Sequence, residues 1–260
     1  MTRTSRLAPL IALATALAGS CTEVSTSPTK VVAIQFDSLP FPAVVSGDTL
    51  RDSLGRAAPL RALAFNSRQQ IIAGALISYL AIDTGITITP DGYVTAQRQY
   101  GTVRILASVG GLQAKDSVQV ARRPDLVIVT GLLADTLRYT LPDNAVQNLS
   151  SPLAVRLVTA DSAAGVGGTR GWLVSYQVYF RGQPLAARDT TVASIWGDDG
   201  RISGTDTTDA TFTASRRLRV RPQAPTFTAA ESLIVIATVG YRGAPVRGSP
   251  VRFVIHTRPK

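Results

Sequence analysis

From Val31 onward the chain is built of short runs in which apolar and polar residues alternate, separated by turn-forming clusters. Alternation with a period of two places every second side chain on the same face of a β-strand. Plentiful Val, Ile, Leu and Thr with only 17% charged residues favour a folded, β-rich chain over a disordered one. We therefore predict an all-β fold.

The stretch 31–121 contains a regular series of such runs. Turn residues lie between them at 46–48 and 90–92, and Gly110-Gly111 marks a hairpin. The apolar stretch 71–82 fits a buried strand pair or a helix, and Gly74 with its β-branched flanks favours strands. The other predicted strands are 31–36, 60–65, 86–88, 93–96, 103–109 and 116–121.

A polar hinge, 122–125, precedes a second β-rich stretch that extends to residue 260. Turn clusters at 142–144, 165–171, 198–200 and 240–250 divide it. Eight strands in this length suit a sandwich with long loops. The predicted strands are 126–129, 153–159, 172–180, 190–196, 210–214, 218–220, 232–239 and 251–257.

Residues 83–96 form a recognisable pattern: a strand, the turn Asp91-Gly92, and then Val94-Thr95-Ala96. This pattern resembles the signature of group 2 bacterial immunoglobulin-like domains, and 101–107, 116–120 and Gly47-Asp48-Thr49 also fit it. The tryptophan frequent in that family is absent, with Tyr79 as its replacement. The stretch 122–260 looks loosely like invasin-type immunoglobulin-like domains, in which a Thr/Asp-rich turn ending in glycine precedes a strand. The resemblances imply two tandem immunoglobulin-like β-sandwiches, 31–121 and 122–260.

The amino terminus has the layout of an export signal. Arg3 and Arg6 precede a twelve-residue apolar run, 7–18, which is too short to span a bilayer. The exit Ala18-Gly19-Ser20-Cys21 resembles the lipobox of bacterial lipoproteins. That resemblance implies cleavage after residue 20, lipidation of the Cys21 thiol and acylation of the new amino terminus, as with palmitate.

A polar Ser/Thr/Pro tether, 21–30, would follow the cleavage point. Thr22 stands where an aspartate marks inner-membrane retention in that family, which favours the outer membrane, on its periplasmic or surface face. The alternative is an ordinary secretory signal with a chance cysteine.

The net charge is +10 and the cations are mostly arginine. A basic chain can bind nucleic acid, but export argues against that partner. Anionic glycans, lipid head groups or envelope proteins remain as partners besides the membrane.

Catalytic residues are scarce. His256 is the only histidine, Glu23 and Glu231 are the only glutamates, and no nucleophile-elbow motif occurs. Arg252, Val254 and His256 alternate on one face that we expect to be wet. We therefore predict a protein that is not an enzyme and needs no cofactor.

Four aspartates in one loop region are the best candidate metal site. Calcium prefers six to eight oxygen ligands, which neighbouring loops could supply, although the spacing is not that of an EF-hand. Aspartate also favours turns by bonding nearby backbone amides, and this is the preferred interpretation. The residues are Asp198, Asp199, Asp206 and Asp209.

Arg217, Arg219 and Arg221 alternate with apolar residues and share one face of a predicted strand. They are a candidate anion-binding stripe. The alternative, which we prefer, is a solvated face or a charged edge strand protected from aggregation.

Two further features have structural interpretations. Trp172, Val174, Tyr176 and Val178 share a face at period two and predict a core stripe rather than a sugar-stacking platform, with Tyr179 on the opposite face. The sequence Asn148-Leu149-Ser150 matches a glycosylation acceptor by chance. Together, the observations favour a non-catalytic binding, adhesion or spacer module, and the alternative is a structural subunit of an envelope assembly.

Overall fold

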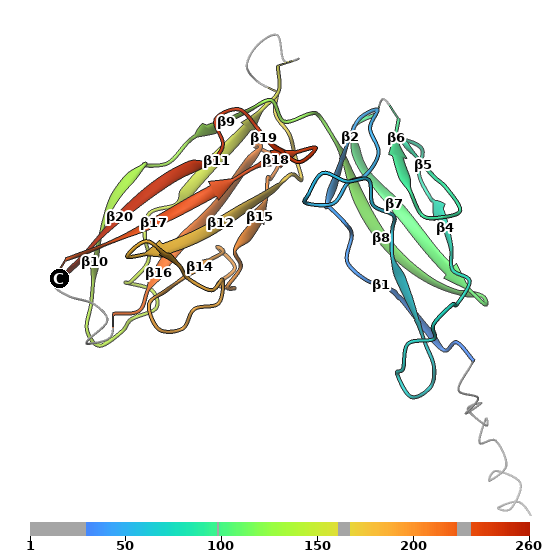
Figure 1. Cartoon of the computed structure of the whole chain (residues 1–260), viewed down its shortest axis with the longest axis horizontal. Helices are drawn as coiled ribbons and strands as arrows, with labels where there is room; N and C mark the ends of the chain where they lie inside the picture. The colour runs from blue at the N-terminus through green and yellow to red at the C-terminus, as the bar shows by residue number, and fades with distance from the viewer. Residues whose placement is uncertain (1–29, 98, 161–166, 223–229) are drawn as a thin grey trace, which may run out of the picture.

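The computed structural model describes residues 30–97, 99–160, 167–222 and 230–260 (Figure 1). All regular secondary structure within these ranges is β, which confirms the predicted all-β fold. None of the described residues belongs to a helix that could cross a membrane. The export signal, Cys21 and most of the tether lie outside the described residues.

The described sheets form two groups, one on each side of residues 122–125 (Figure 1). We call residues 30–121 the N-terminal region and residues 122–260 the C-terminal region. The strands of the N-terminal region are β1 (Ala33–Phe36), β2 (Ala43–Val45), β3 (Ala62–Phe65), β4 (Ser78–Ala81), β5 (Ile86–Ile88), β6 (Val94–Ala96), β7 (Gly101–Val109) and β8 (Leu112–Ala121).

In the N-terminal region, a four-stranded sheet has the order β2-β8-β7-β4, and the pairs β1-β3 and β5-β6 form two further two-stranded sheets. The hairpin between β7 and β8 turns at Gly110 and Gly111, whose φ angles are 55° and 83°. Two successive positive φ values define a turn whose twist matches that of the flanking strands, and glycine adopts them without strain. The predicted hairpin is confirmed.

The prediction of a buried strand pair at 71–82 is wrong. Only β4 is a strand there, and Gly74 has a φ of 76° in a turn. Ile71, Leu76 and Leu80 are 58%, 93% and 62% exposed. The stretch 71–82 is apolar, but β4 pairs on one side only, with β7. Side chains from other strands fill the core.

The C-terminal region is an all-β sandwich, and its two sheets have the strand order of an immunoglobulin-like fold. Its first sheet has the order β9-β11-β16-β14, and the other has β10-β20-β17-β12-β13, with β15 also paired to β12. In chain order these are the A-B-E-D and A′-G-F-C-C′ sheets of that fold. The strands are β9 (Leu126–Val129), β10 (Ala134–Tyr139), β11 (Leu153–Val158), β12 (Leu173–Phe180), β13 (Gln183–Pro184), β14 (Ala193–Trp196), β15 (Thr205–Thr207), β16 (Thr213–Val220), β17 (Glu231–Thr238), β18 (Gly240–Tyr241), β19 (Ala244–Pro245) and β20 (Val251–Pro259).

Both regions repeat a topological feature that the sequence pattern did not indicate. A short early strand pairs in parallel with the last strand of the same region: β2 with β8, and β10 with β20. Neither β2 nor β10 was among the predicted strands. The single strand β16 was predicted as two strands, 210–214 and 218–220, because the consecutive Arg216 and Arg217 interrupt the alternation.

Candidate functional site

The two regions meet at Asp48, which lies just after β2 and is only 8% exposed. Its Oδ1 accepts hydrogen bonds from the Thr49 backbone N–H at 2.8 Å and from Arg51 Nη2 at 2.9 Å. Arg51 Nε donates to the other oxygen, Oδ2, at 3.1 Å. The Arg51 contact is therefore bidentate, which holds the carboxylate in a fixed orientation.

The C-terminal region supplies two further donors to the same carboxylate. The Tyr241 hydroxyl and Arg242 Nε each donate to Asp48 Oδ2 at 3.0 Å. Both residues belong to the hairpin β18–β19, which extends toward the loop after β2 (Figure 1). Arg242 and Gly243 have φ angles of 51° and 78°, so a tight two-residue turn presents the Arg242 side chain.

The electrostatics favour an ionised Asp48. Burial raises the pKa of its carboxyl, but hydrogen bonds from Arg51, Arg242, Thr49 and Tyr241 outweigh burial and hold that pKa well below its usual range. Burial and the bond to Asp48 raise the pKa of the Tyr241 hydroxyl, which keeps it protonated as a donor. A single carboxylate thus joins two guanidinium groups from opposite sides of the junction.

Backbone atoms also touch across the junction. A Cβ built on Gly55 would lie 2.0 Å from the Gly243 nitrogen, and one on Gly243 would lie 2.8 Å from the Leu54 carbonyl oxygen. Real Cβ atoms do not approach so closely, so these positions require glycine. The turn 52–55 and the β18–β19 hairpin therefore pack backbone against backbone.

Aromatic rings complete the junction. The Phe41 and Trp172 rings lie 4.8 Å apart between centroids, and Trp172 meets Tyr241 edge to face at 5.9 Å. Trp172 Nε1 donates to the Gly240 carbonyl at 3.2 Å, so its polar atom is satisfied. Around Asp48 these contacts leave a cavity of about 30 Å³, which has room for water only. A more open cleft of about 280 Å³ lies beside it, lined by Phe41 and the β18–β19 hairpin. Chemically, this site can fix the N-terminal region against the C-terminal region.

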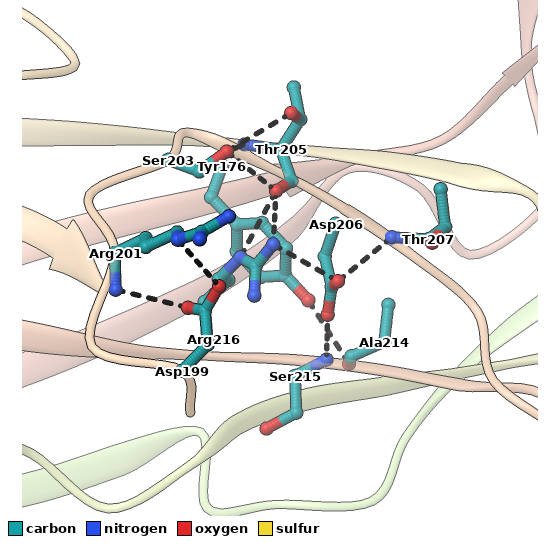
Figure 2. A network of polar contacts seen from close by, with 10 residues as sticks. All are labelled: Tyr176, Asp199, Arg201, Ser203, Thr205, Asp206, Thr207, Ala214, Ser215 and Arg216. Carbon is teal, nitrogen blue, oxygen red and sulfur yellow. Dashed lines mark hydrogen bonds and ion pairs between the residues drawn. The ribbon is translucent and has the colours of Figure 1, made fainter. Parts of the chain in front are cut away.

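The four candidate metal-binding aspartates point to different partners. Asp206 accepts from the Ser215 N–H at 2.8 Å and pairs with Arg216 at 3.1 Å, as Figure 2 shows. In the same view Asp199 accepts from the Arg201 N–H at 3.0 Å, away from Asp206. Asp198 lies 3.6 Å from Arg217.

Asp209 bonds the backbone of its own turn, accepting from the Thr211 and Thr213 N–H groups at 2.7 and 3.0 Å. These are the turn contacts that the preferred interpretation predicts. Across the described ranges, no three His, Cys, Asp or Glu side chains gather where they could hold a metal ion.

The three arginines of the candidate stripe do not lie on an edge strand, because β16 is paired on both sides, with β14 and β11. The edge-strand interpretation is therefore wrong. Arg219 is buried, pairs with Asp143 at 2.7 Å and lies 5.2 Å from the centre of the Trp196 ring. Arg217 donates to the Ser150 carbonyl and Arg221 to the Thr190 carbonyl, each at 3.1 Å. All three arginines thus hold neighbouring segments of the C-terminal region.

The predicted core stripe along and just before β12 is confirmed, since Trp172, Val174, Tyr176 and Val178 are each at most 4% exposed. His256 lies on the exposed face of β20 as expected, with Nδ1 2.9 Å from Ser232 Oγ.

Asn148 is fully buried and has a structural role. Its Oδ1 accepts from the Thr140 N–H and its Nδ2 donates to Asp143, both at 2.8 Å. Burial of this kind leaves the amide inaccessible for glycosylation of the folded chain.

The junction was not predicted from the sequence. The sequence pattern identifies Gly47-Asp48-Thr49 only as a family position, and nothing local distinguishes Arg242 from other surface arginines. The glycines at 52–55 and 242–243 do indicate two turns, but they do not indicate that the two turns contact each other.

No family model and no curated protein matches the sequence. Among solved structures, domains 4 and 5 of the S-layer protein SbsC align with a TM-score of 0.31 at 11% identity, covering 88% of this chain and 99% of that one. The Yersinia pseudotuberculosis adhesin InvE gives 0.35 at 13% identity, covering 86% of this chain and 58% of that one. The D0-D1 domain of Intimin gives 0.27 at 13% identity, covering 86% and 98%. The immunoglobulin-like fold of the C-terminal region follows from its strand order.

Proposed function

We propose that this chain is a non-catalytic lipoprotein of the cell envelope, fastened through Cys21, whose two sandwiches form a stiff spacer that presents a binding surface to glycan or protein. The lipobox-like exit supports the anchor, and Thr22 in place of an aspartate supports an outer-membrane location. The strand order supports the immunoglobulin-like architecture, which commonly serves binding through loops and sheet edges.

The observation that carries the spacer is the junction at Asp48. Domain pairs with small polar interfaces move relative to one another by default. Three kinds of contact hold this junction together. They are the hydrogen bonds of a nearly buried carboxylate, a glycine-to-glycine backbone contact and the packing of three aromatic rings. Such a junction fixes the orientation of one region relative to the other, so a surface at the far end is held at a defined distance from the tether.

Distance measurement between spin labels tests the spacer. Labels on Lys115→Cys in β8 and Arg258→Cys in β20, both exposed positions, report on the two regions in a Cys21→Ser background. A stiff spacer predicts one narrow distance distribution, which Asp48→Ala broadens. A broad distribution in the chain with native Asp48 would disprove the spacer.

Fractionation and protease shaving of intact cells test the anchor. The native chain should stay in the membrane fraction, whereas Cys21→Ser should be released. Cleavage from outside the cell would assign the surface face, and protection until the outer membrane is broken would assign the periplasmic face. Equal fractionation of both variants would reject the anchor.

A second function, as a structural subunit of an envelope assembly, is favoured by one observation. Ile71, Leu76 and Leu80 are exposed on and before the edge strand β4, which pairs on one side only. Exposed apolar side chains beside an unpaired strand edge are typical of protein contacts. Crosslinking in cells through a photoreactive residue at position 76 tests this second function, which requires that a discrete envelope protein be captured at this edge.

A further inference from the structure

Another cleft lies where the two regions meet, beside Tyr100 and Arg122. Its volume is about 280 Å³, close to the lower end of the roughly 300–1,000 Å³ typical of small-ligand pockets. Tyr100, Gly101 and Arg122 line it from the N-terminal region and the connection, and Gly168, Arg170 and Phe212 from the C-terminal region. This size suits one ring-sized group rather than an extended chain.

The cleft is electropositive. Arg122 and Arg170 both line it, and among the described residues neither guanidinium forms an ion pair and no acidic side chain contributes to the lining. Elsewhere many arginines of this protein are matched to carboxylates, as in the pairs with Asp48, Asp143 and Asp206. A planar guanidinium donates two parallel N–H bonds to a carboxylate, so two such groups favour an acidic ligand.

Two aromatic rings border the same space. Tyr100 is 57% exposed, and the Arg122 guanidinium lies 4.6 Å from its ring centre, so a cation and an exposed aromatic ring lie side by side at the cleft. Phe212 has a φ of 66°, a conformation that a bulky side chain rarely adopts. Gly168 lies against this ring, since a Cβ there would be 2.4 Å from Phe212 Cγ. The backbone thus keeps an aromatic ring at the cleft despite an unfavourable local conformation.

We propose that this cleft binds a sugar acid, with the carboxylate on Arg122 and Arg170 and the pyranose ring against Tyr100. An aromatic face packs against the C–H face of a sugar ring, and guanidinium groups recognise its acid. A small inorganic anion would leave the rings unused. The inference deepens the glycan-binding half of the proposed function and is independent of the stiffness of the spacer.

Titration calorimetry with D-galacturonate tests the site in the full mature chain carrying Cys21→Ser. D-galactose, acetate and N-acetylglutamate serve as a neutral sugar, a bare carboxylate and an acidic peptide group. We expect galacturonate to bind at least tenfold more tightly than each of the three. Arg170→Gln should weaken galacturonate binding at least tenfold, as should Arg122→Gln.

The matched control is Arg252→Gln, which removes the same charge from the exposed face of β20 and should leave binding unchanged. Tyr100→Ala should weaken galacturonate but not acetate. Thermal unfolding shows that each variant is folded.

Absence of galacturonate binding would overturn the inference, as would equal weakening by Arg252→Gln, which would indicate unspecific attraction. Tighter binding of N-acetylglutamate than of galacturonate would assign the cleft to acidic peptides and would also reject the inference. None of these results alters the distance distribution between spin labels, so failure here is distinguishable from failure of the spacer.

Discussion

Asp48 and Arg242 are 194 positions apart in the chain, yet Arg242 Nε donates to Asp48 Oδ2 at 3.0 Å. Arg51 and Tyr241 converge on the same carboxylate, one from each side of the junction. Without that carboxylate, two guanidinium groups would face each other across the contact. Asp48 is therefore the residue on which the relative placement of the two regions depends most directly.

Replacing Asp48 with Asn should loosen the junction while both sandwiches stay folded. The amide keeps the shape of the side chain but loses the charge that pairs with Arg51 and Arg242, so we expect the free energy of unfolding to fall by about 1–3 kcal/mol. Denaturant unfolding measures the loss, and the spin-label distance shows its location. The matched control is Asp37→Asn, at an exposed position, which should change stability by less than about 0.5 kcal/mol. Equal effects of the two variants would contradict the role of Asp48.

The junction should weaken in acid. The pKa of Asp48 is lowered in the folded chain, so its contribution is fully present above the unfolded value of about 3.9 and is lost as pH falls through the lower, folded value. Asp189 and Asp209 also have lowered pKa values, so the native chain alone does not isolate Asp48. The free energy of unfolding measured from pH 7 to pH 3 for the native chain, minus that for Asp48→Asn, should shrink below about pH 4. A constant difference over that range would contradict the assignment.

Gly55→Ala should disrupt the junction by collision. Gly55 and Gly47 have nearly the same φ, 82° and 80°, so alanine is strained equally at both, by roughly 1–2 kcal/mol. A Cβ on Gly47 meets nothing within 4 Å, whereas one on Gly55 would lie 2.0 Å from the Gly243 nitrogen. Gly55→Ala should therefore cost more in unfolding free energy than Gly47→Ala, and only Gly55→Ala should broaden the spin-label distance. Equal losses of unfolding free energy and equal distance distributions for the two variants would contradict the collision, because the loop would then have moved aside.

Two arginines on β16 provide a test of burial. Arg219 is 7% exposed and pairs with Asp143, whereas Arg217 meets the largely exposed Asp198 at 3.6 Å. Asp143→Ala strands a buried guanidinium and also removes a partner of Asn148, so we expect a loss of roughly 2–3 kcal/mol in unfolding free energy. Asp198→Ala should cost at most about 1 kcal/mol, since solvent screens an exposed pair. Thermal and denaturant unfolding measure both, and a larger loss for Asp198→Ala would refute the ranking.

Local patterns were sufficient for much of the fold. Alternation located most strands, Gly110 and Gly111 located the hairpin between β7 and β8, and the period-two stripe from Trp172 to Val178 located a buried face. They failed at 71–82, where an apolar composition normally indicates burial. Whether such residues are covered depends on which strands lie beside them, and β4 has a neighbour on one side only.

By itself, the sequence determined the all-β class, the turns and the alternation of faces, because these follow from steric and hydrogen-bonding preferences within a few residues. Only the tertiary structure decided that β16 lies inside a sheet, that β2 and β10 pair in parallel with distant strands, and that Asp48 meets Arg242. These are contacts between residues far apart in the chain, selected by the packing of whole sheets. Nothing in the chemistry of either neighbourhood alone specifies its partner.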